Sequence, residues 1–373
     1  MPLSCIDRNS GEVLNATTMP GFAWDELQLQ NQKMAHLRMR CCDAEVVLKT
    51  SKLGTRFFAH KSKGDCSAKS ESVAHLSLKE LAFTSAKAHE WDAITEHLGG
   101  GEDERWVADV YASKSEKNLA IEIQWTAQTD EETIRRQRRY RESGVLGFWV
   151  FRQEKFHTDR HTPGFRVRED PNEGFVVEAH VDLSMQCKDT PAVEFFEHVF
   201  TEACQPGIPI GVVLPLSIYV ASIKCWRCRR ATDIIYEICI GSNYGDYRYD
   251  LRVDDFEEHE DLLQDILTRL PEDLAIGEIK LRYSRTADAA YLSNGCFHCD
   301  ALFGSFYEYR YVYDAKRVRT FNTKIDGEMR EILYEKYEHL EDTWGVFTSL
   351  RQIESPNLQH ALSKNDSDEL KLI

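Results

Sequence analysis

The chain has 373 residues, of which 42% are hydrophobic and 11 are cysteines, and its formal net charge at pH 7 is -16. This length exceeds the usual size of a single core, so two domains are expected. The acidic balance excludes attraction of the whole surface to nucleic acid or to an anionic membrane, whereas a local basic patch can still bind phosphates.

The N-terminus, MPLSCIDRNS, has neither the basic start and apolar run of a secretory signal nor the arginine-rich bias of a transit peptide. The most apolar segment, residues 208–223, is shorter than a bilayer span and is interrupted by Pro209 and Pro215, so we expect a buried strand. These features predict a cytoplasmic protein that does not bind membranes. They also predict that its cysteines are thiols or metal ligands rather than a disulfide framework.

From residue 46 onward the spacing of apolar residues predicts a series of strands and helices, whereas residues 1–40 give weak signals and only a short strand near 12–14. The expected elements are strands at 46–49 and 56–60, a helix at 67–91 capped by Ser67 or Ser70, a hairpin of strands at 105–112 and 119–125, a helix within 129–144, and a buried strand at 145–151. In the second helix, Thr129 and Glu132 have capping-box spacing and Gly144 can provide the left-handed end. A helix between two strands favours a mixed sheet with a crossover.

A change of composition after Arg152 predicts a domain boundary, because residues 153–174 are polar and rich in proline and glycine. The expected division is an N-terminal segment at 1–40 of unclear role, an α/β domain at 41–153, a linker and connecting helix at 154–200, an α+β domain at 201–355, and a polar tail at 356–373. The expected elements beyond the boundary are a helix at 192–203, strands at 208–223 and 232–240, an acidic helix at 256–270, and aromatic strands near 305–314.

The predicted hairpin carries two carboxylates, Asp109 and Glu122, on neighbouring strands. Two carboxylates a few ångströms apart repel each other unless a proton or a cation lies between them. Mg²⁺ binds one or two carboxylates together with water and phosphate oxygens, so the pair predicts a metal site that can polarise a phosphodiester. The alternative is that both carboxylates are solvated groups on the polar face of the hairpin, as is common.

Three polar residues in the first expected helix, Glu71, His75 and Lys79, are spaced four residues apart. This spacing places them on one side of a helix, bordering its apolar stripe. We therefore expect them at the edge of the core, directed into a cleft beside the sheet. The alternative is an ordinary ladder of paired charges on the surface of the helix.

These motifs together resemble a known family. The run FFAHKSKGDCSAKSESVAHLSLKEL, followed by RWVADV and LAIEIQW, resembles the competence protein CoiA-like family, whose nuclease domain belongs to the PD-(D/E)XK, restriction-endonuclease-like superfamily. The resemblance covers about residues 41–153. It implies that Asp109 and Glu122 are ligands of Mg²⁺ or Mn²⁺, and that Glu71 adds a further acidic group.

The same resemblance places Gln124 at the position that is lysine in much of the superfamily. A lysine there can stabilise the charge that develops on the phosphate, whereas a neutral glutamine can only orient groups by hydrogen bonds. Lys79 is therefore a candidate source of the missing positive charge.

Basic residues cluster in the second expected helix of this otherwise acidic chain. They are Arg135, Arg136, Arg138, Arg139 and Arg141. Such a cluster can hold a phosphate backbone without reading its sequence. The alternative, which we weigh equally, is a solvated helix face on which these arginines pair with nearby glutamates.

Two CxxC pairs, Cys225 with Cys228 and Cys296 with Cys299, predict a structural Zn²⁺ site in the C-terminal domain. Residues 229–295 separate the pairs, more than the roughly 15 to 20 of the usual pattern, so an insertion is expected between them. Because four protein ligands leave no open position, this metal is expected to be structural rather than catalytic. The alternative is four buried thiols without a metal.

A weaker cluster near the N-terminus consists of Cys42, His60 and Cys66. The family resemblance implies a CxxC pair at this point, but Met39 occupies the place of its first cysteine. The site is therefore expected to be degenerate. The adjacent Cys41 is an alternative ligand that stays open, although we do not count it among the expected ligands.

The expected fold class is α/β, with a restriction-endonuclease-like mixed sheet flanked by helices and a C-terminal α+β zinc-binding domain. The resemblance implies a Mg²⁺-dependent nuclease that hydrolyses DNA in uptake, repair or defence, with DNA and other DNA-processing or defence proteins as partners. Asp109 and Glu122 are the expected metal ligands, with Glu71 in support and Gln124 as a positioning group. Two other interpretations stay open, a nucleic-acid-binding protein that no longer cuts and a zinc-scaffolded protein-interaction module.

Overall fold

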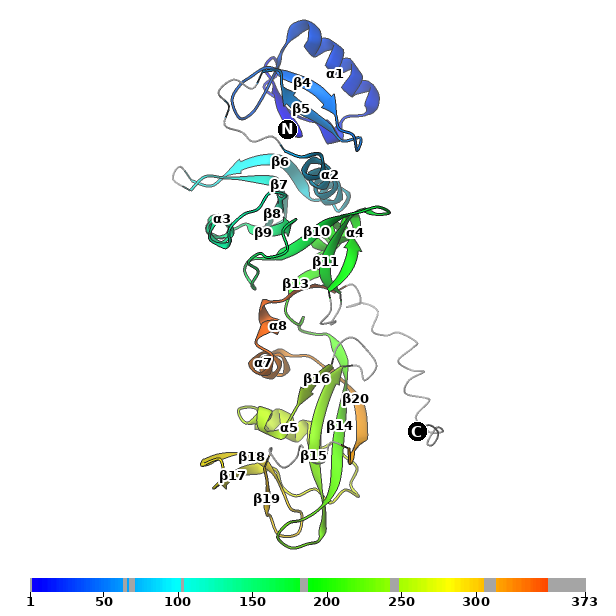
Figure 1. The fold of residues 1–373 in the computed structure, drawn as a ribbon, viewed down its shortest axis with the longest axis vertical. Coiled ribbons are helices and arrows are strands. Elements are labelled where there is room, and N and C mark those ends of the chain that lie inside the picture. Colours follow the sequence, from blue (N-terminus) through cyan, green and yellow to red (C-terminus); the bar gives the residue numbers. More distant parts are fainter. Residues whose placement is uncertain are drawn as a thin grey trace. The chain divides into compact units, whose positions relative to one another are not determined.

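The computed structural model describes residues 2–62, 66, 71–101, 104–181, 187–241, 248–304 and 313–347. It divides into two compact units (Figure 1). The first unit contains Met1–Val181, Cys187–Pro206 and Asp342–Phe347, and the second contains Gly207–Glu341. Each unit is described by itself.

The first unit is built from strands with a few helices. Its elements are β1 (Ser4–Asp7), β2 (Val13–Asn15), α1 (Gly21–Met34), β3 (Leu37–Arg38), β4 (Val46–Thr50), β5 (Arg56–His60), α2 (Val73–Ala88), β6 (Asp92–Gly99), β7 (Trp106–Lys114), β8 (Lys117–Gln124), α3 (Asp130–Glu142), β9 (Leu146–Phe151), β10 (Gly164–Asp170), β11 (Gly174–Val181), β12 (Cys187–Pro191), α4 (Ala192–Phe200), β13 (Cys204–Pro206) and β21 (Trp344–Val346).

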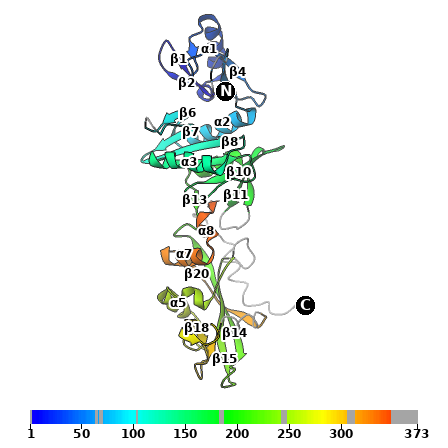
Figure 2. The ribbon, with the colours of Figure 1, turned by 60° about the vertical axis from the view of Figure 1, so that its left-hand side comes forward.

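A mixed sheet forms the centre of this unit, with the strand order β13-β21-β11-β10-β9-β8-β7-β6 and with β12 paired to β11. β6, β7 and β8 form an antiparallel meander, and α3 then crosses over to β9, which runs parallel to β8. α2 and α4 share one hydrophobic core with the sheet, whereas Tyr140 of α3 packs into a separate core with Trp149 and Phe151. The helices and the sheet are drawn from a second direction in Figure 2. The predicted mixed sheet with flanking helices is confirmed.

The hairpin and the second helix of this sheet form largely as the sequence predicts. α3 is capped by Thr129, whose side chain accepts a hydrogen bond from the backbone N–H of Glu132, and Gly144 adopts the left-handed conformation with φ +69°. Ser115 has φ +55° in the tight turn between β7 and β8. These local signals worked because caps and turns depend on residues close in sequence.

The first helix is shorter than predicted. α2 begins at Val73, after the N-cap Ser72, whose side chain accepts the backbone N–H of His75 at 3.1 Å. The predicted caps Ser67 and Ser70 lie outside the described residues. The helix ends at Ala88, because the chain turns sharply at Glu90, which has φ +63°.

Two expectations about the order of elements differ from the structure. The strand β6, at Asp92–Gly99, was not predicted, and it makes the hairpin a three-stranded meander. The region at 154–200 contains the predicted connecting helix as α4, but in place of a linker it contains β10, β11 and β12, which continue the sheet and its core. β10 alternates the buried residues Phe165 and Val167 with arginines, a pattern that resembles a polar linker in composition but not in period.

Residues before α2 form a small substructure within the first unit. β1 pairs with both β2 and β3, and β4 pairs with β5. The rings of Trp24 in α1 and Phe58 in β5 pack against each other, with 5.3 Å between their centroids. Leu3, Phe57 and Leu76 form a further buried cluster that joins this substructure to α2.

The second unit is mainly antiparallel, with the sheet order β16-β15-β14-β20 and a smaller sheet β17-β18-β19. Its elements are β14 (Val213–Lys224), β15 (Ala231–Gly241), β16 (Arg248–Leu251), α5 (Glu260–Leu267), β17 (Lys280–Ser284), β18 (Ala289–Gly295), β19 (Leu302–Phe303), β20 (Ala315–Lys324) and α7 (Gly327–Lys336), followed by α8 (His339–Asp342). The buried strand expected at 208–223 corresponds to β14. The aromatic strands expected near 305–314 and the tail at 356–373 fall on residues outside the described ranges, except for 313 and 314. Within the described part of the chain, no helix has both the length and the apolar character needed to span a membrane.

Candidate active site

Lys79 of α2 lies at the centre of a charged cluster between α2 and strands β6 and β7. Its side chain is completely buried, and its Nζ atom lies 2.6 Å from Glu96, 3.0 Å from Glu71 and 3.6 Å from Asp109. A buried ammonium group is strongly unfavourable without anionic partners. Burial opposes the charged form of Lys79, but the three carboxylates outweigh this effect and raise its pKa above the ordinary value.

Three side chains of metal-ligand type gather beside this lysine. Ligand atoms of Glu71, His75 and Asp109 all lie within 4.8 Å of one another. Nε2 of His75 lies 3.2 Å from Oδ2 of Asp109, and the same Oδ2 accepts a hydrogen bond from the backbone N–H of Ile123 at 2.9 Å. Two carboxylates and an imidazole form a donor set suited to a divalent ion.

The charge states of this group follow from its surroundings. Burial opposes ionisation of Asp109, but His75 and Lys79 together hold the pKa of Asp109 well below its usual value. Burial also opposes the charged form of His75, but Asp109 outweighs it and raises the pKa of His75. Asp109 is therefore available as an anionic ligand, whereas His75 must release a proton before it can bind a metal.

The position of Glu71 differs from the prediction in one respect. Glu71 precedes the N-cap Ser72, so it lies just before α2 rather than on the helix with His75 and Lys79. Its carboxylate nevertheless reaches Lys79. The three residues meet as predicted, although the helical spacing explains the meeting of only His75 and Lys79.

Glu96 completes the charged cluster and was not predicted. It lies on β6, and the register of β6 with β7 places it across from Asp109. Its carboxylate accepts hydrogen bonds from the backbone N–H of Leu3 at 3.0 Å and from the hydroxyl of Ser4 at 2.6 Å. Glu96 has φ +49°, a left-handed conformation that costs of the order of 1 to 3 kcal/mol for a residue other than glycine.

Weak patterning explains why β6 and Glu96 were missed. In DAITEHLG, only Ala93 and Thr95 are buried alternating residues, and the left-handed Glu96 interrupts the period at the next position. The available signal was this short alternation, together with the glycines that follow it at 99–101.

Glu122 lies on β8, and the register with β7 makes it the cross-strand neighbour of Asp109. Its side chain is buried and is held from α3, because Oε2 lies 2.6 Å from Arg136 and Oε1 accepts the hydroxyl hydrogen of Tyr140. Burial raises the pKa of Glu122 to about 7, despite the opposing effect of Arg136. Asp109 and Glu122 are thus adjacent along the sheet, while the close ligand group forms from Asp109, Glu71 and His75.

Gln124 lies at the end of β8, where its side-chain amide donates a hydrogen bond to the backbone oxygen of Thr126 at 2.8 Å. This contact orients the amide along the loop that follows the strand. Lys79, the candidate replacement cation, is enclosed by carboxylates and has no exposed surface. Its charge therefore acts on the ligand carboxylates rather than at the surface of the protein.

In the ranges that the structure describes, four of the five arginines in the predicted cluster, all except Arg141, have acidic partners. Arg136 pairs with Glu122 and lies 4.8 Å above the Trp149 ring. The other pairs are Arg135 with Glu132 at 2.5 Å, Arg138 with Glu142 at 3.8 Å, and Arg139 with Glu104 at 2.7 Å. The structure therefore favours the paired helix face over a free phosphate-binding ridge.

In the second unit the two predicted CxxC pairs come together. The sulfur of Cys225 lies 3.7 Å from that of Cys299, and the sulfur of Cys228 lies 3.6 Å from that of Cys296. Both pairs have the same backbone turn, in which the N–H after the second cysteine bonds to the carbonyl of the first cysteine, at 3.0 Å for Arg229 and at 2.9 Å for the equivalent residue after Cys299. All four sulfurs lie within 4.8 Å of one another, so this tetrad can hold a metal ion.

The N-terminal cysteine cluster also assembles, contrary to the expectation of a degenerate site. Cys41 lies 3.7 Å from Cys66 and 3.6 Å from Nε2 of His60, and Cys42 lies 3.2 Å from the same nitrogen. Cys41 therefore offers a fourth ligand atom in a group that could hold a metal ion, whereas Met39 is buried in the neighbouring core. The prediction failed because spacing alone does not show that the turn after β3 brings two adjacent cysteines to one point.

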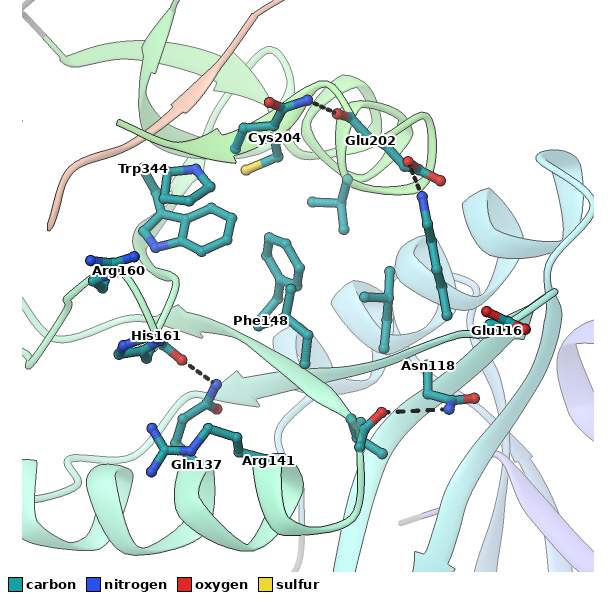
Figure 3. A pocket seen from close by; sticks show the side chains of 18 of the residues that line it. Glu116, Asn118, Gln137, Arg141, Phe148, Arg160, His161, Glu202, Cys204 and Trp344 are labelled. Carbon is teal, nitrogen blue, oxygen red and sulfur yellow. Dashed lines mark hydrogen bonds and ion pairs between the residues drawn. The ribbon is translucent and has the colours of Figure 1, made fainter. Parts of the chain in front are cut away.

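A separate cavity of about 730 Å³ lies at the N-terminal ends of β8 and β9 (Figure 3). Phe148 and Trp344 form part of its apolar wall, and Arg141 and His161 lie on its polar side. None of the candidate ligands Glu71, His75 and Asp109 lines it, so it is distinct from the charged cluster.

The first unit contains an α/β domain whose mixed sheet carries these acidic groups on β6, β7 and β8, at one edge of the sheet. Residues 71–195 match the family described as Competence protein CoiA, nuclease-like domain. The match extends beyond the expected limit of 153 and includes β10, β11 and β12, in agreement with the continuous sheet. No curated protein and no solved structure matches the chain.

Proposed function

We propose that the protein is a metal-dependent nuclease that hydrolyses DNA phosphodiester bonds. The observation that carries this proposal is the gathering of Glu71, His75 and Asp109 within 4.8 Å, inside the segment that matches the CoiA nuclease-like domain. When bound, a divalent ion polarises the phosphodiester and lowers the pKa of nearby water. Glu71, His75 and Asp109 are the residues that would hold it.

The types of ligand atom at this site indicate which metal ion it would prefer. Carboxylates suit Mg²⁺ and Mn²⁺ alike, whereas an imidazole ligand is unusual for Mg²⁺ and common for transition metals. The side chain of His75 therefore supports Mn²⁺ as the more effective ion, with Mg²⁺ as an alternative. Lys79 stabilises the three carboxylates around it when no ion is bound.

Glu122 and Gln124 have supporting roles in this proposal. Glu122 has a pKa of about 7, so its carboxyl group can hold or release a proton near neutral pH. Arg136 and Tyr140 fix its orientation. Gln124 can orient water or a phosphate oxygen by hydrogen bonding, in the place where much of the superfamily has lysine.

We propose structural Zn²⁺ for the two cysteine clusters. Thiolates and an imidazole are the ligands of tetrahedral zinc, and each cluster supplies four of them without an open position. These ions would stabilise the two units and would take no part in hydrolysis.

A second candidate function is a nucleic-acid-binding protein that has lost cleavage. The observation that favours it is the complete burial of Lys79 among carboxylates, which keeps its charge from a substrate in a site where Gln124 takes the place of the usual lysine. DNA is the partner in both proposals, and a role in uptake, repair or defence with other DNA-processing proteins extends either one.

The test is cleavage of single-stranded and double-stranded DNA with Mn²⁺, Mg²⁺ or no added divalent ion. We expect Mn²⁺-dependent cutting by the wild type and its loss in Asp109→Asn and His75→Ala. Asp92→Asn, which changes an exposed carboxylate on β6, is the control and should cut normally. DNA binding without cutting by the wild type, with zinc retained, would favour the second candidate.

A further inference from the structure

The two cysteine knuckles of the second unit carry exposed aromatic side chains. Trp226 lies between Cys225 and Cys228, and Phe297 lies between Cys296 and Cys299. Trp226 is 59% exposed and Phe297 is 56% exposed. Large aromatic side chains in the middle of tight turns contribute nothing to a core, so their exposure points to a contact outside the chain.

These aromatic side chains are held on a rigid base. The indole N–H of Trp226 donates to the backbone oxygen of Leu302 at 3.0 Å, and the backbone N–H of Phe297 donates to the hydroxyl of Thr232 at 3.0 Å. The close approach of the four cysteine sulfurs fixes the two turns relative to each other. A ligand that stacks on these rings therefore orders little of the protein, which reduces the entropic cost of binding.

The first knuckle, which contains Cys225 and Cys228, is strongly basic although the chain as a whole is acidic. Lys224, Arg227, Arg229 and Arg230 are all exposed, while the whole chain has a net charge of -16. Among the described residues, none of these four cations has a carboxylate partner within 4.0 Å. This differs from α3, where each of the four predicted phosphate-binding arginines is paired with an acid.

The acidic groups that flank the two knuckles do not neutralise this patch. Asp233, the nearest in sequence, accepts hydrogen bonds from the hydroxyl of Ser222 and from the backbone N–H of Ala275. Asp300 follows the second knuckle, but it pairs with Lys280 at 3.1 Å and with Arg282. The four cations thus remain available to an anionic ligand. A phosphate can therefore bind these arginines without first breaking an existing ion pair.

We propose that the two knuckles form a binding surface for a nucleic acid single strand. Bases stack on Trp226 and Phe297, and phosphates contact Lys224, Arg227, Arg229 and Arg230. The combination of stacking rings and cations is the usual chemistry of single-strand binding. A duplex keeps its bases stacked inside, so it would leave both rings unused, and the knuckles present no helix for a major groove.

This inference goes beyond the proposed nuclease activity, because the surface lies in the second unit and takes part in no step of hydrolysis. It gives the chain a site for single-stranded substrate or product that is separate from the metal site. DNA and RNA share the chemistry that the surface recognises, so the test includes both.

The experiment measures fluorescence anisotropy of labelled oligothymidylate, oligouridylate and a duplex of equal length. It uses the full-length protein with zinc retained, and carries Asp109→Asn throughout so that cleavage cannot affect the result. We expect tighter binding of a single strand than of the duplex. Trp226→Ala with Phe297→Ala should weaken single-strand binding by roughly tenfold or more, since stacking contributes about 1 to 3 kcal/mol per base.

Replacement of Arg227, Arg229 and Arg230 by glutamine should weaken binding and reduce its dependence on salt, by about 0.7 in the logarithmic slope for each lost phosphate contact. Tyr283→Ala and Arg285→Gln, which alter an exposed ring and an exposed cation elsewhere in the second unit, serve as controls and should bind normally. Zinc content equal to that of the wild type shows that the knuckles remain folded. Unchanged single-strand binding by the aromatic and arginine variants, or a preference for duplex, would overturn the proposal whether or not the protein cuts DNA.

Discussion

The Nζ atom of Lys79 lies 2.6 Å from Oε1 of Glu96, closer than it lies to either Glu71 or Asp109. Its charge is therefore directed mainly at a residue that is not among the three gathered ligands. Glu96 is itself fixed by the backbone of Leu3, so the N-terminal strand helps to set the electrostatics of the candidate metal site. Lys79 also lies 3.0 Å from Glu71 and 3.6 Å from Asp109, so it stabilises the ligand carboxylates directly as well.

Replacement of Lys79 by methionine should destabilise the protein when no divalent ion is present. Three carboxylates would lose their buried cation, and the expected loss is about 3 to 5 kcal/mol in the free energy of unfolding. A divalent ion can supply the missing positive charge, so Mn²⁺ should restore part of the stability and bind the variant more tightly than the wild type. Urea unfolding at pH 7, with and without Mn²⁺, measures both effects.

Lys87→Met is the matched control for this experiment, because Lys87 is on the same helix and pairs with Asp92 at 2.9 Å in a largely exposed position. Its loss should change stability by no more than about 0.5 kcal/mol. Equal destabilisation by both variants, or no response of Lys79→Met to Mn²⁺, would contradict the role assigned to Lys79.

His75 predicts a pH dependence of metal binding. Asp109 raises the pKa of His75 against the effect of burial, so the imidazole is protonated at low pH and competes with a metal. Mn²⁺ affinity should therefore increase as pH rises through this pKa, and the dependence should become flatter in His75→Gln. Titration of Mn²⁺ by electron paramagnetic resonance at several pH values between about 5.5 and 8.5 measures the affinity.

The stability of the metal-free protein should change in the opposite direction. A raised pKa in the folded state means that the His75–Asp109 pair stabilises fully below the ordinary value of about 6.5, and that this contribution is lost as pH rises through the raised value. His198→Gln is the control, because His198 has the same side-chain exposure of 17% beside Glu194. If the free energy of unfolding depends on pH in the same way in His75→Gln and in His198→Gln, that result would argue against a stabilising His75–Asp109 pair.

Glu122 makes a separate prediction, since burial raises its pKa from 4.5 to about 7. The folded state then holds a proton that the unfolded state has released, so the stability contributed by this group decreases as pH rises from about 4.5 to 7. Glu122→Gln should remove this decrease, which amounts to up to about 3 kcal/mol. Urea unfolding between pH 4.5 and 8 tests the slope, with Glu132→Gln on the exposed face of α3 as the control. An unchanged slope in Glu122→Gln would show that the carboxyl is ionised throughout this range.

The sequence was most informative where structure depends on neighbouring residues. The strand β8, the Thr129 cap of α3 and the two CxxC turns were all predicted, because each is determined over a few positions. The burial of both faces of β8 was not, because it depends on α3. The metal-type side chains His75 and Asp109 were also found, since one follows from helical spacing and the other from strand position.

The remaining features depend on contacts between distant segments. Burial of Lys79 is favourable only because Glu71, Glu96 and Asp109 arrive from three different segments, and a sequence pattern cannot show that balance. The orientation of Glu122 toward α3 depends likewise on Arg136 reaching back across the sheet. Local patterns therefore located candidate residues, whereas their pairing required the tertiary structure.

The two cysteine clusters predict two zinc ions in each chain. Cys225→Ser should lose the ion of the second unit, and Cys42→Ser should lose the ion of the N-terminal cluster, so each variant should retain about one zinc. Because structural zinc contributes to folding, each loss should also increase proteolysis of the unit concerned. Elemental analysis of purified protein measures the zinc content, and Cys239→Ser, which changes a buried cysteine outside both clusters, should retain both ions. Retention of two ions by Cys42→Ser would show that Cys41, His60 and Cys66 do not need it, and a single ion in the wild type would remove one of the two sites.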